Sequence, residues 1–185
     1  MISEKEKCWQ GKLYDPNNDA DLIAERQICK VLCHEYNHLP PSETKRREEM
    51  ILSLFGKTGC SFLIEQPFFC DYGYNIEIGE NFYANVNCVI LDAAKVTFGD
   101  NVFIAPNCGF YTAGHPLEME QRNRGLEYAR PIHIGNNVWI GAHVSVLPGV
   151  TIGNNCVIGA GSVVNKDIPE GTLAVGNPCH VIRNL

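Results

Sequence analysis

The sequence has 185 residues, enough to bury a hydrophobic core within one domain without disulfides or metals to hold it together. Its formal net charge of -6 at pH 7 argues against nucleic acid or an anionic membrane as a partner, because the overall field would repel both. No signal peptide or membrane-spanning run is predicted, so the expected location is the cytoplasm.

Nine cysteines are spread along the chain, and none forms a Cys-x-x-Cys pair. The odd number and the irregular spacing argue against a disulfide framework. Cys29 and Cys33 are four residues apart and could share a helix face, but two thiols do not make a closed zinc site. The cysteines are therefore interpreted as small apolar residues of the core.

Residues 1–57 are predicted to form a helical segment. A first helix is expected between Ala20 and Asn37, with Asn18 or Asp19 as its cap, and a second from Ser42 to a stop at Gly56. The charged run 45–49 in the second helix indicates a solvated face. The apolar residues that recur at helical spacing in the first helix are Leu22, Ile23, Ile28, Val31, Leu32 and Tyr36.

From Ile78 onward the sequence repeats every six residues. In the later block, from Ile134 to Val164, a small or branched residue follows each first position by four residues, and in four cases glycine comes directly after the first position. One block of repeats ends at Phe110, the next begins at Ile134, and the segment between them must be a loop. The first positions are Ile78, Ala84, Ile90, Phe98, Ile104, Phe110, Ile134, Ile140, Val146, Ile152, Ile158 and Val164.

This period predicts short strands that turn a corner every six residues and stack as coils. The first position points inward, the residue four places later fills a corner, and glycine is expected to permit the backbone conformation of the corner. Cys88, Cys108 and Cys156 fall at the corner-filling position and should be buried. The amino-terminal helices are expected to cap the open end of the stack, because an uncovered coil would expose its core.

The repeats that begin Ile134-Gly135-Asn136-Asn137-Val138-Trp139-Ile140-Gly141 resemble those of the left-handed β-helix acyltransferases. Within that group the chain is similar to the maltose and galactoside O-acetyltransferases over nearly its whole length. The shared segments include Gly11-Lys12-Leu13-Tyr14, Tyr36-Asn37-His38, Asp71-Tyr72-Gly73-Tyr74-Asn75-Ile76 and Asn81-Phe82-Tyr83-Ala84-Asn85.

The resemblance implies a mainly β fold: a left-handed parallel β-helix of hexapeptide repeats, an amino-terminal helical cap and a long inserted loop. On this basis residues 1–57 form the cap, and residues 58–185 form the acetyltransferase domain with a loop at 114–131 and a short carboxy-terminal tail. It also implies a homotrimer whose active sites lie between subunits, with acetyl-CoA as cosubstrate, a sugar as acceptor and no metal.

Acetyl transfer from a thioester to a hydroxyl needs a base, donors for the developing oxyanion and a slot that holds both substrates. His115 lies where the repeats give way to the loop, a position that packing of the coils does not explain, and an imidazole titrates near neutral pH. It matches the catalytic histidine of the family, which is likewise followed by proline. The residues matching acceptor positions are Asp15, Asp71, Tyr83, Asn85, Asp92 and Glu127.

Short polar side chains recognise sugar hydroxyls, and the spacing of Asp71, Asn85 and Asp92 predicts that they line one edge of successive coils. Glu127 is expected either to bind the acceptor or to orient His115. Ala93 replaces a carboxylate of the galactoside enzymes, which favours maltose, glucose or a related glucoside. Asparagines at the repeat corners are interpreted as turn formers: Asn81, Asn101, Asn136 and Asn154.

The remaining matches concern acetyl-CoA. The resemblance implies that the backbone at Ala142 contributes to the thioester carbonyl site, that Ala160 lines the pantetheine arm and that Trp139 walls the slot. Asn165, Lys166, His180 and Arg183 would lie near the nucleotide and its phosphates, although the family often has Thr-Lys where this chain has Asn165-Lys166.

Two other functions remain open at this point. The γ-type carbonic anhydrases use the same scaffold to bind a metal through three histidines, and His133 and His143 lie on repeats. Alternatively, the stack could be a binding scaffold without catalytic activity.

Overall fold

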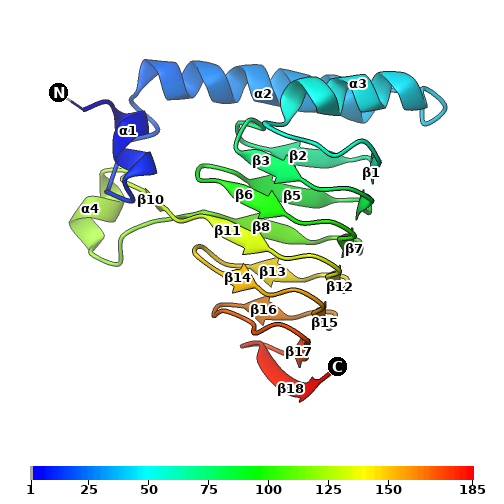
Figure 1. Ribbon diagram of the computed structural model, residues 1–185. Helices are drawn as coiled ribbons and strands as arrows, with labels where there is room; N and C mark the ends of the chain where they lie inside the picture. Colours follow the sequence, from blue (N-terminus) through cyan, green and yellow to red (C-terminus); the bar gives the residue numbers. More distant parts are fainter. Residues whose placement is uncertain (1) are drawn as a thin grey trace.

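Three helices precede the strands in the computed structural model, which describes residues 2–185: the second and third lie across one end of the stack of coils, and the first lies to one side of it (Figure 1). They are α1 (Glu4–Trp9), α2 (Ala20–His38) and α3 (Thr44–Leu54). Ser3 and Glu6 form a capping box at α1, and the Asp19 side chain accepts a hydrogen bond from the Leu22 N–H at the start of α2. No described helix is long and apolar enough to cross a bilayer.

The predicted bounds of α2 are correct to within one residue, and Leu22 and Tyr36 are buried as expected, but three other residues of the predicted apolar face are exposed. Ile23, Ile28 and Val31 are 43–62% exposed. The buried stripe consists of Leu22, Cys29, Cys33 and Tyr36. Small thiols occupy the positions where α2 packs against the first coil, so the face is less apolar than the isoleucines suggested.

Two predictions about α3 are corrected. The helix starts at Thr44 after Glu43, and neither Ser42 nor Glu43 provides a side-chain cap. The charged run is not wholly solvated, because Arg47 is buried: its guanidinium donates to the Ile64 carbonyl over 2.7 Å and to the Glu65 carboxylate over 3.1 Å.

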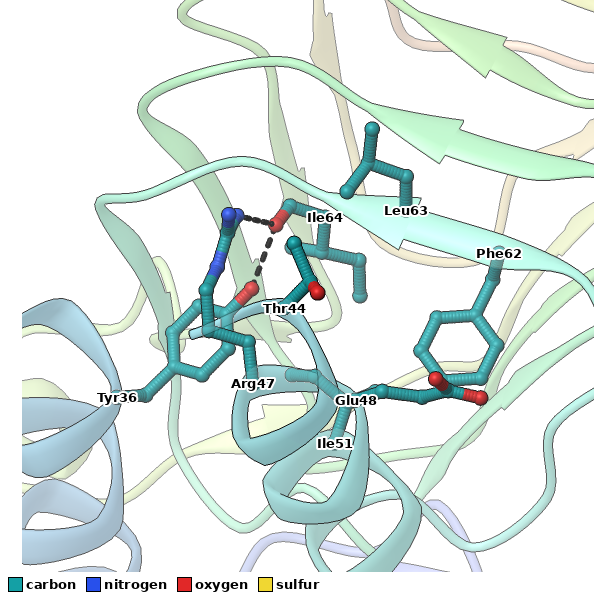
Figure 2. A pocket seen from close by; sticks show the side chains of 8 residues that line it. All are labelled: Tyr36, Thr44, Arg47, Glu48, Ile51, Phe62, Leu63 and Ile64. Carbon is teal, nitrogen blue, oxygen red and sulfur yellow. Dashed lines mark hydrogen bonds between the residues drawn. The ribbon is translucent and has the colours of Figure 1, made fainter. Parts of the chain in front are cut away.

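The Tyr36 hydroxyl donates to the same Ile64 carbonyl, so α2 and α3 both hold the first strand (Figure 2). Charge-assisted bonds of this kind, made away from water, fix the cap on the coil.

The strands of the stack form three sheets, one along each side, and a fourth sheet of two strands lies in the inserted loop. The β1 sheet contains β1 (Phe62–Ile64), β4 (Phe82–Ala84), β7 (Phe103–Ile104), β12 (Trp139–Ile140), β15 (Val157–Ile158), β17 (Thr172–Val175) and β18 (His180–Asn184). The β2 sheet contains β2 (Phe68–Cys70), β5 (Cys88–Leu91), β8 (Gly109–Tyr111), β13 (Ser145–Val146) and β16 (Val163–Val164). The β3 sheet contains β3 (Ile76–Ile78), β6 (Val96–Phe98), β11 (Ile132–Ile134) and β14 (Thr151–Ile152).

The chain passes through the β1, β2 and β3 sheets in turn and pairs in parallel with the coil before, until β18 reverses against β17. The predicted fold is confirmed: it is a left-handed parallel β-helix with a helical cap and an inserted loop. The proposed domain boundary at residues 57/58 stays a prediction. Lys57, the last residue before it, forms an isolated parallel β-bridge with Glu77.

Every predicted inward position is buried, and so are Cys88, Cys108 and Cys156. Along the axis, the Phe98 ring packs edge-on against Phe82 and Phe110, with centroids 5.1 and 5.0 Å apart. Because each coil covers its apolar residues only with its neighbours, the six-residue period defines the core directly.

The corner between the β3 and β1 sheets corrects the predicted role of two asparagines. The residues with left-handed backbone are Asn81, Asn101, Asn137 and Asn155, whose φ values lie between 54° and 57°. Their amides form a chain of side-chain hydrogen bonds from coil to coil. Asn136 and Asn154 do not take this conformation, and instead each accepts from the backbone N–H of the preceding coil.

The glycines after the inward aliphatics have a different purpose from the one predicted. Gly135, Gly141, Gly153 and Gly159 do not have positive φ. They are needed because the next coil passes too close: a Cβ on Gly135 would lie 2.6 Å from the Asn154 side-chain oxygen and 2.8 Å from its backbone nitrogen.

Replacing Gly135 by alanine should therefore force two coils apart. We expect Gly135→Ala to lower the free energy of unfolding by about 1–3 kcal/mol, a typical cost of overpacking. Urea denaturation followed by circular dichroism measures this loss. Thr151→Ala, on the exposed outer face of the β3 sheet, is the matched control and should change stability little. Equal stability of both variants would contradict the close-contact explanation.

Candidate active site

The long loop leaves the stack between β8 and β11, at the corner between the β2 and β3 sheets. It contains β9 (Ala113–Gly114), α4 (Met119–Asn123) and β10 (Tyr128–Ala129), and its two short strands pair antiparallel at its base. In Figure 1 the loop projects to the left of the stack, whereas β7 and β12 lie at the right. This hairpin base holds the loop in a defined place beside α1.

His115 directly follows β9, and its side chain is half exposed. Its Nδ1 lies 2.9 Å from the Leu126 carbonyl oxygen. Because a carbonyl can only accept, Nδ1 carries the proton in this bond, and the neutral ring keeps the Nε2 lone pair free. The loop therefore presents an imidazole that can accept a proton at Nε2.

Glu127 lies on the Nε2 side of this ring, with Oε1 3.9 Å from His115 Nε2. Burial raises the pKa of the Glu127 carboxyl, and the Tyr14 hydroxyl donates to its other oxygen over 3.2 Å. The backbones of Tyr14 and Glu127 also exchange two hydrogen bonds of 3.0 Å. Tyr14 is fully buried, and its bonds to Glu127 fix the loop against the amino-terminal segment. Spacing along the sequence did not reveal this positioning role.

Asp71 and Asp92 follow β2 and β5 and so lie at the same corner on adjacent coils. Asp92 is fully buried, and its Oδ1 accepts from the backbone N–H groups of Asp71 and Tyr72 at 3.0 and 2.9 Å. Asp92 therefore cannot line an open edge in this chain. It holds the backbone on either side of the Asp71 side chain.

The electrostatics of the two aspartates differ. Burial raises the pKa of Asp92 to about 6, and its Oδ2 has no hydrogen-bond partner among the described residues. Burial also raises the pKa of Asp71, but Arg26 and Lys30 oppose that shift.

Arg26 is a residue that sequence reasoning missed. It donates to the Tyr72 hydroxyl over 2.8 Å and to the Pro16 carbonyl over 2.6 Å, and its charge acts on both Asp71 and Glu127. In the sequence, Arg26 is one more charged residue of a helix, and nothing in the spacing indicates that its charge acts on two carboxylates.

Asp15 lies next to Tyr14, and its carboxylate accepts from the Asn17 and Asn18 backbones and from the Asn18 side chain. The Asn18 side-chain hydrogen bond lowers the pKa of Asp15 most strongly. The structure thus places Asp15, Glu127 and His115 around one side of the loop, with Asp71 linked to them through the charge of Arg26.

The other predicted residues lie elsewhere. Asn85, Ala142 and Ala160 follow strands of the β1 sheet and occupy the corner between the β1 and β2 sheets. The expectation that Asn85 shares an edge with Asp71 and Asp92 is therefore wrong. Tyr83 and Trp139 stand on the outer face of the β1 sheet in one ladder, with Phe103 paired to both.

Trp139 is 56% exposed, so the ladder presents apolar surface to its surroundings. Asn165 and Lys166 follow β16 and return to the corner that carries Asp71, farther along the stack. His180 and Arg183 lie on β18, opposite Val175 and Leu173 of β17. The predicted residues thus form two groups. One lies at or near the corner between the β2 and β3 sheets, and the other lies on the β1 sheet or at the corner beside it.

Among residues 2–185, neither histidine of the metal hypothesis belongs to a group of side chains that could share a metal ion. His133 Nδ1 lies 2.8 Å from Thr97 on the β3 sheet, and His143 contacts Asn107 at the corner between the β1 and β2 sheets. Among residues 2–185, the group of side chains close enough to share an ion consists of Cys29, Cys33 and Cys70 instead.

Comparison with known proteins adds to this geometry. Residues 7–59 match the model of the maltose acetyltransferase hexapeptide capping motif, and residues 131–166 match the bacterial transferase hexapeptide with six repeats. The galactoside O-acetyltransferase of Escherichia coli is 49% identical over 97% of this chain and 88% of its own length.

Two solved structures are similar over the whole chain. A maltose O-acetyltransferase from Clostridium difficile superposes with a TM-score of 0.98 and is 52% identical, with 98% of its own chain covered. A galactoside acetyltransferase in complex with coenzyme A gives a TM-score of 0.96 at 48% identity, with 92% of its chain covered.

The buried Asp92 generates a prediction about pH. Its pKa is higher in the folded state than the ordinary value near 3.9, so its ionisation opposes folding above about pH 6. That opposition is lost as the pH falls from 6 toward 4. We expect the unfolding free energy of the parent chain to gain on the order of 1 kcal/mol, relative to Asp92→Asn, between pH 7 and pH 5.

Denaturant unfolding of both proteins at the two pH values measures the difference. Asp21→Asn, which removes an exposed carboxylate from α2, is the control. A parallel pH dependence for the parent and Asp92→Asn would contradict the assignment.

Proposed function

Because the chain belongs to the maltose and galactoside O-acetyltransferases, we propose that it transfers an acetyl group from acetyl-CoA to a hydroxyl of maltose, glucose or a related glucoside, with His115 as general base. The observation that carries this proposal is the free Nε2 of His115, set by the bond from Nδ1 to the Leu126 carbonyl. The chain is an acetyltransferase, and the specific sugar and the role of each residue are what the proposal adds.

The reaction runs in a ternary complex. The sugar hydroxyl gives its proton to His115 Nε2 while its oxygen attacks the thioester carbonyl carbon. The C–S bond then breaks, and the departing thiolate of coenzyme A takes the proton back from the imidazolium. Glu127, 3.9 Å away, stabilises the imidazolium between these steps, and no covalent enzyme intermediate is needed.

Both substrates must meet at this base, yet the matched residues lie on two corners of one chain. Asp15, Asp71 and Glu127 accompany His115, whereas Asn85, Trp139, Ala142 and Ala160 lie on or beside the β1 sheet. A homotrimer solves this, because a three-fold ring can bring the β1 sheet of one subunit against the loop of the next. Each of three sites would then take residues from two subunits.

In that arrangement the backbone at Ala142 supports the thioester carbonyl, and Trp139 and Ala160 line the pantetheine arm. Lys166 and Arg183 supply positive charge for the phosphates of coenzyme A, with Asn165 and His180 beside them. The acceptor contacts Asp15, Asp71, Tyr83 and Asn85, while Asp92 acts by holding the Asp71 backbone.

One further feature supports the proposal. Ala93 is packed against Cys8, whose thiol donates to the Ala93 carbonyl over 3.3 Å, so a glucoside acceptor meets no carboxylate there. The expected compartment is the cytoplasm, where acetyl-CoA is available as cosubstrate.

The first test replaces the base. We expect His115→Ala to reduce kcat for sugar-dependent thiol release from acetyl-CoA by about 10²–10⁴-fold, the usual contribution of a general base. The KM for acetyl-CoA should change little. The assay uses maltose, glucose, galactosides and no sugar.

His133→Ala, whose ring contacts Thr97 on the β3 sheet, is the control and should keep full activity. Thiol release that is independent of sugar, or that survives in His115→Ala, would refute the mechanism.

The second test asks whether the site is shared between subunits. His115→Ala and Asn85→Ala should each be inactive, but refolding them together should restore up to roughly a quarter of the parent activity, since that fraction of sites pairs two intact halves. A mixture of His115→Ala and Glu127→Ala should restore none, because both residues belong to the same half. Equal activity of the two mixtures would exclude a shared site.

A further inference from the structure

Three buried thiols meet where α2 crosses the first coil. Cys29 and Cys33 lie one turn apart on α2, and Cys70 is the last residue of β2. The Cys70 sulfur lies 3.5 Å from that of Cys29 and 3.8 Å from that of Cys33, and all three sulfurs lie within 4.8 Å of one another. The proposed acetyl transfer uses none of them.

Three of the five other buried cysteines make a different kind of contact. Cys8, Cys108 and Cys156 each place their sulfur 3.1–3.3 Å from a backbone carbonyl oxygen of another segment and touch no second thiol. Cys29 has such a carbonyl, that of Cys70 at 3.4 Å, but it also faces the two other sulfurs. The convergence of three sulfurs at this place therefore differs from the contacts that these other buried thiols make.

The spacing of these sulfurs matches that of a thiolate metal site. With zinc–sulfur bonds of about 2.3 Å in tetrahedral geometry, neighbouring sulfurs lie about 3.8 Å apart. The two shorter distances in the cluster are 3.5 and 3.8 Å, so little movement is needed to accept an ion. A disulfide would need two of the sulfurs to approach to about 2.05 Å and would leave the third unexplained.

An ion can also reach the cluster. Cys33 and Cys70 line a cavity of about 730 Å³ beside α2, together with Lys30, His34 and Asn37. The cavity can supply a water molecule for a fourth coordination position. Lys30 at its wall provides a positive charge close to the anionic complex that three thiolates and one divalent ion would form.

We propose that Cys29, Cys33 and Cys70 bind one zinc ion, with a water molecule from the cavity as the fourth ligand. Three thiols bind Zn²⁺ and release three protons to solvent, with no change of oxidation state. The ion tethers α2 to β2 immediately before Asp71. It is a structural clamp between the cap and the coil, separate from the chemistry at His115.

The test uses the whole chain, reduced and stripped of metal with a chelator, and Co²⁺ as a spectroscopic probe. We expect one equivalent of Co²⁺ to give thiolate-to-cobalt absorption that Zn²⁺ abolishes by displacement. Zn²⁺ at about 100 times its Kd should raise Tm by roughly 5–10 °C. His115→Ala should bind in the same way, so the result is independent of the proposed reaction.

Cys33→Ala should lose both the absorption and the rise in Tm. The matched control is Cys156→Ala, which removes a buried thiol outside the cluster and should keep both. Cys29→Ser provides a second cluster variant if Cys33→Ala does not fold. Absence of thiolate-to-cobalt absorption in the parent chain, equal binding by Cys33→Ala, or a disulfide within the cluster of the protein purified without reductant would overturn the proposal.

Discussion

The structure depends on the close approach of each coil to the next. At the corners the backbones come so near that Gly135 has no room for a Cβ. The asparagines with left-handed backbone conformation form side-chain hydrogen bonds from one coil to the next. These contacts fix the register, and the register decides which residues share a corner. The location of every candidate site residue on the coil follows from it.

The loop with His115 leaves the stack at one of these corners without disturbing the coils on either side, since β8 still pairs with β13 and β6 with β11. Its base is fixed by the β9–β10 pairing and by the backbone bonds to Tyr14. The Leu126 carbonyl then selects the tautomer of His115. The position of the base and the tautomer of its neutral form are thus both set by backbone contacts.

Much of the fold was predictable because the six-residue period reports burial directly. Corner identity needed the length of one coil, which the pairing of Phe62 with Phe82 gives: Asp71 and Asp92 share a corner, and Asn85, only 14 residues after Asp71, does not. The error for Asn85 came from counting repeats without counting corners. Handedness came from family resemblance, because the period itself is the same for either hand.

Other features could not be read from spacing. Burial of Asp92 and Arg47 depends on hydrogen bonds to backbone groups of segments distant in sequence. The third sulfur beside Cys29 and Cys33 comes from Cys70, in a different type of element, so no helical spacing reveals it. Arg26 and Tyr14 gain their roles only when the cap folds against the loop.

The most direct test of the central claim is a crystal structure of the chain with coenzyme A and maltose bound. The account predicts that the sulfur of coenzyme A and one maltose hydroxyl both lie beside His115 Nε2 of one subunit, with Ala142 and Trp139 of a second subunit along the pantetheine arm. Coenzyme A bound away from His115, or a complete site within one subunit, would contradict it.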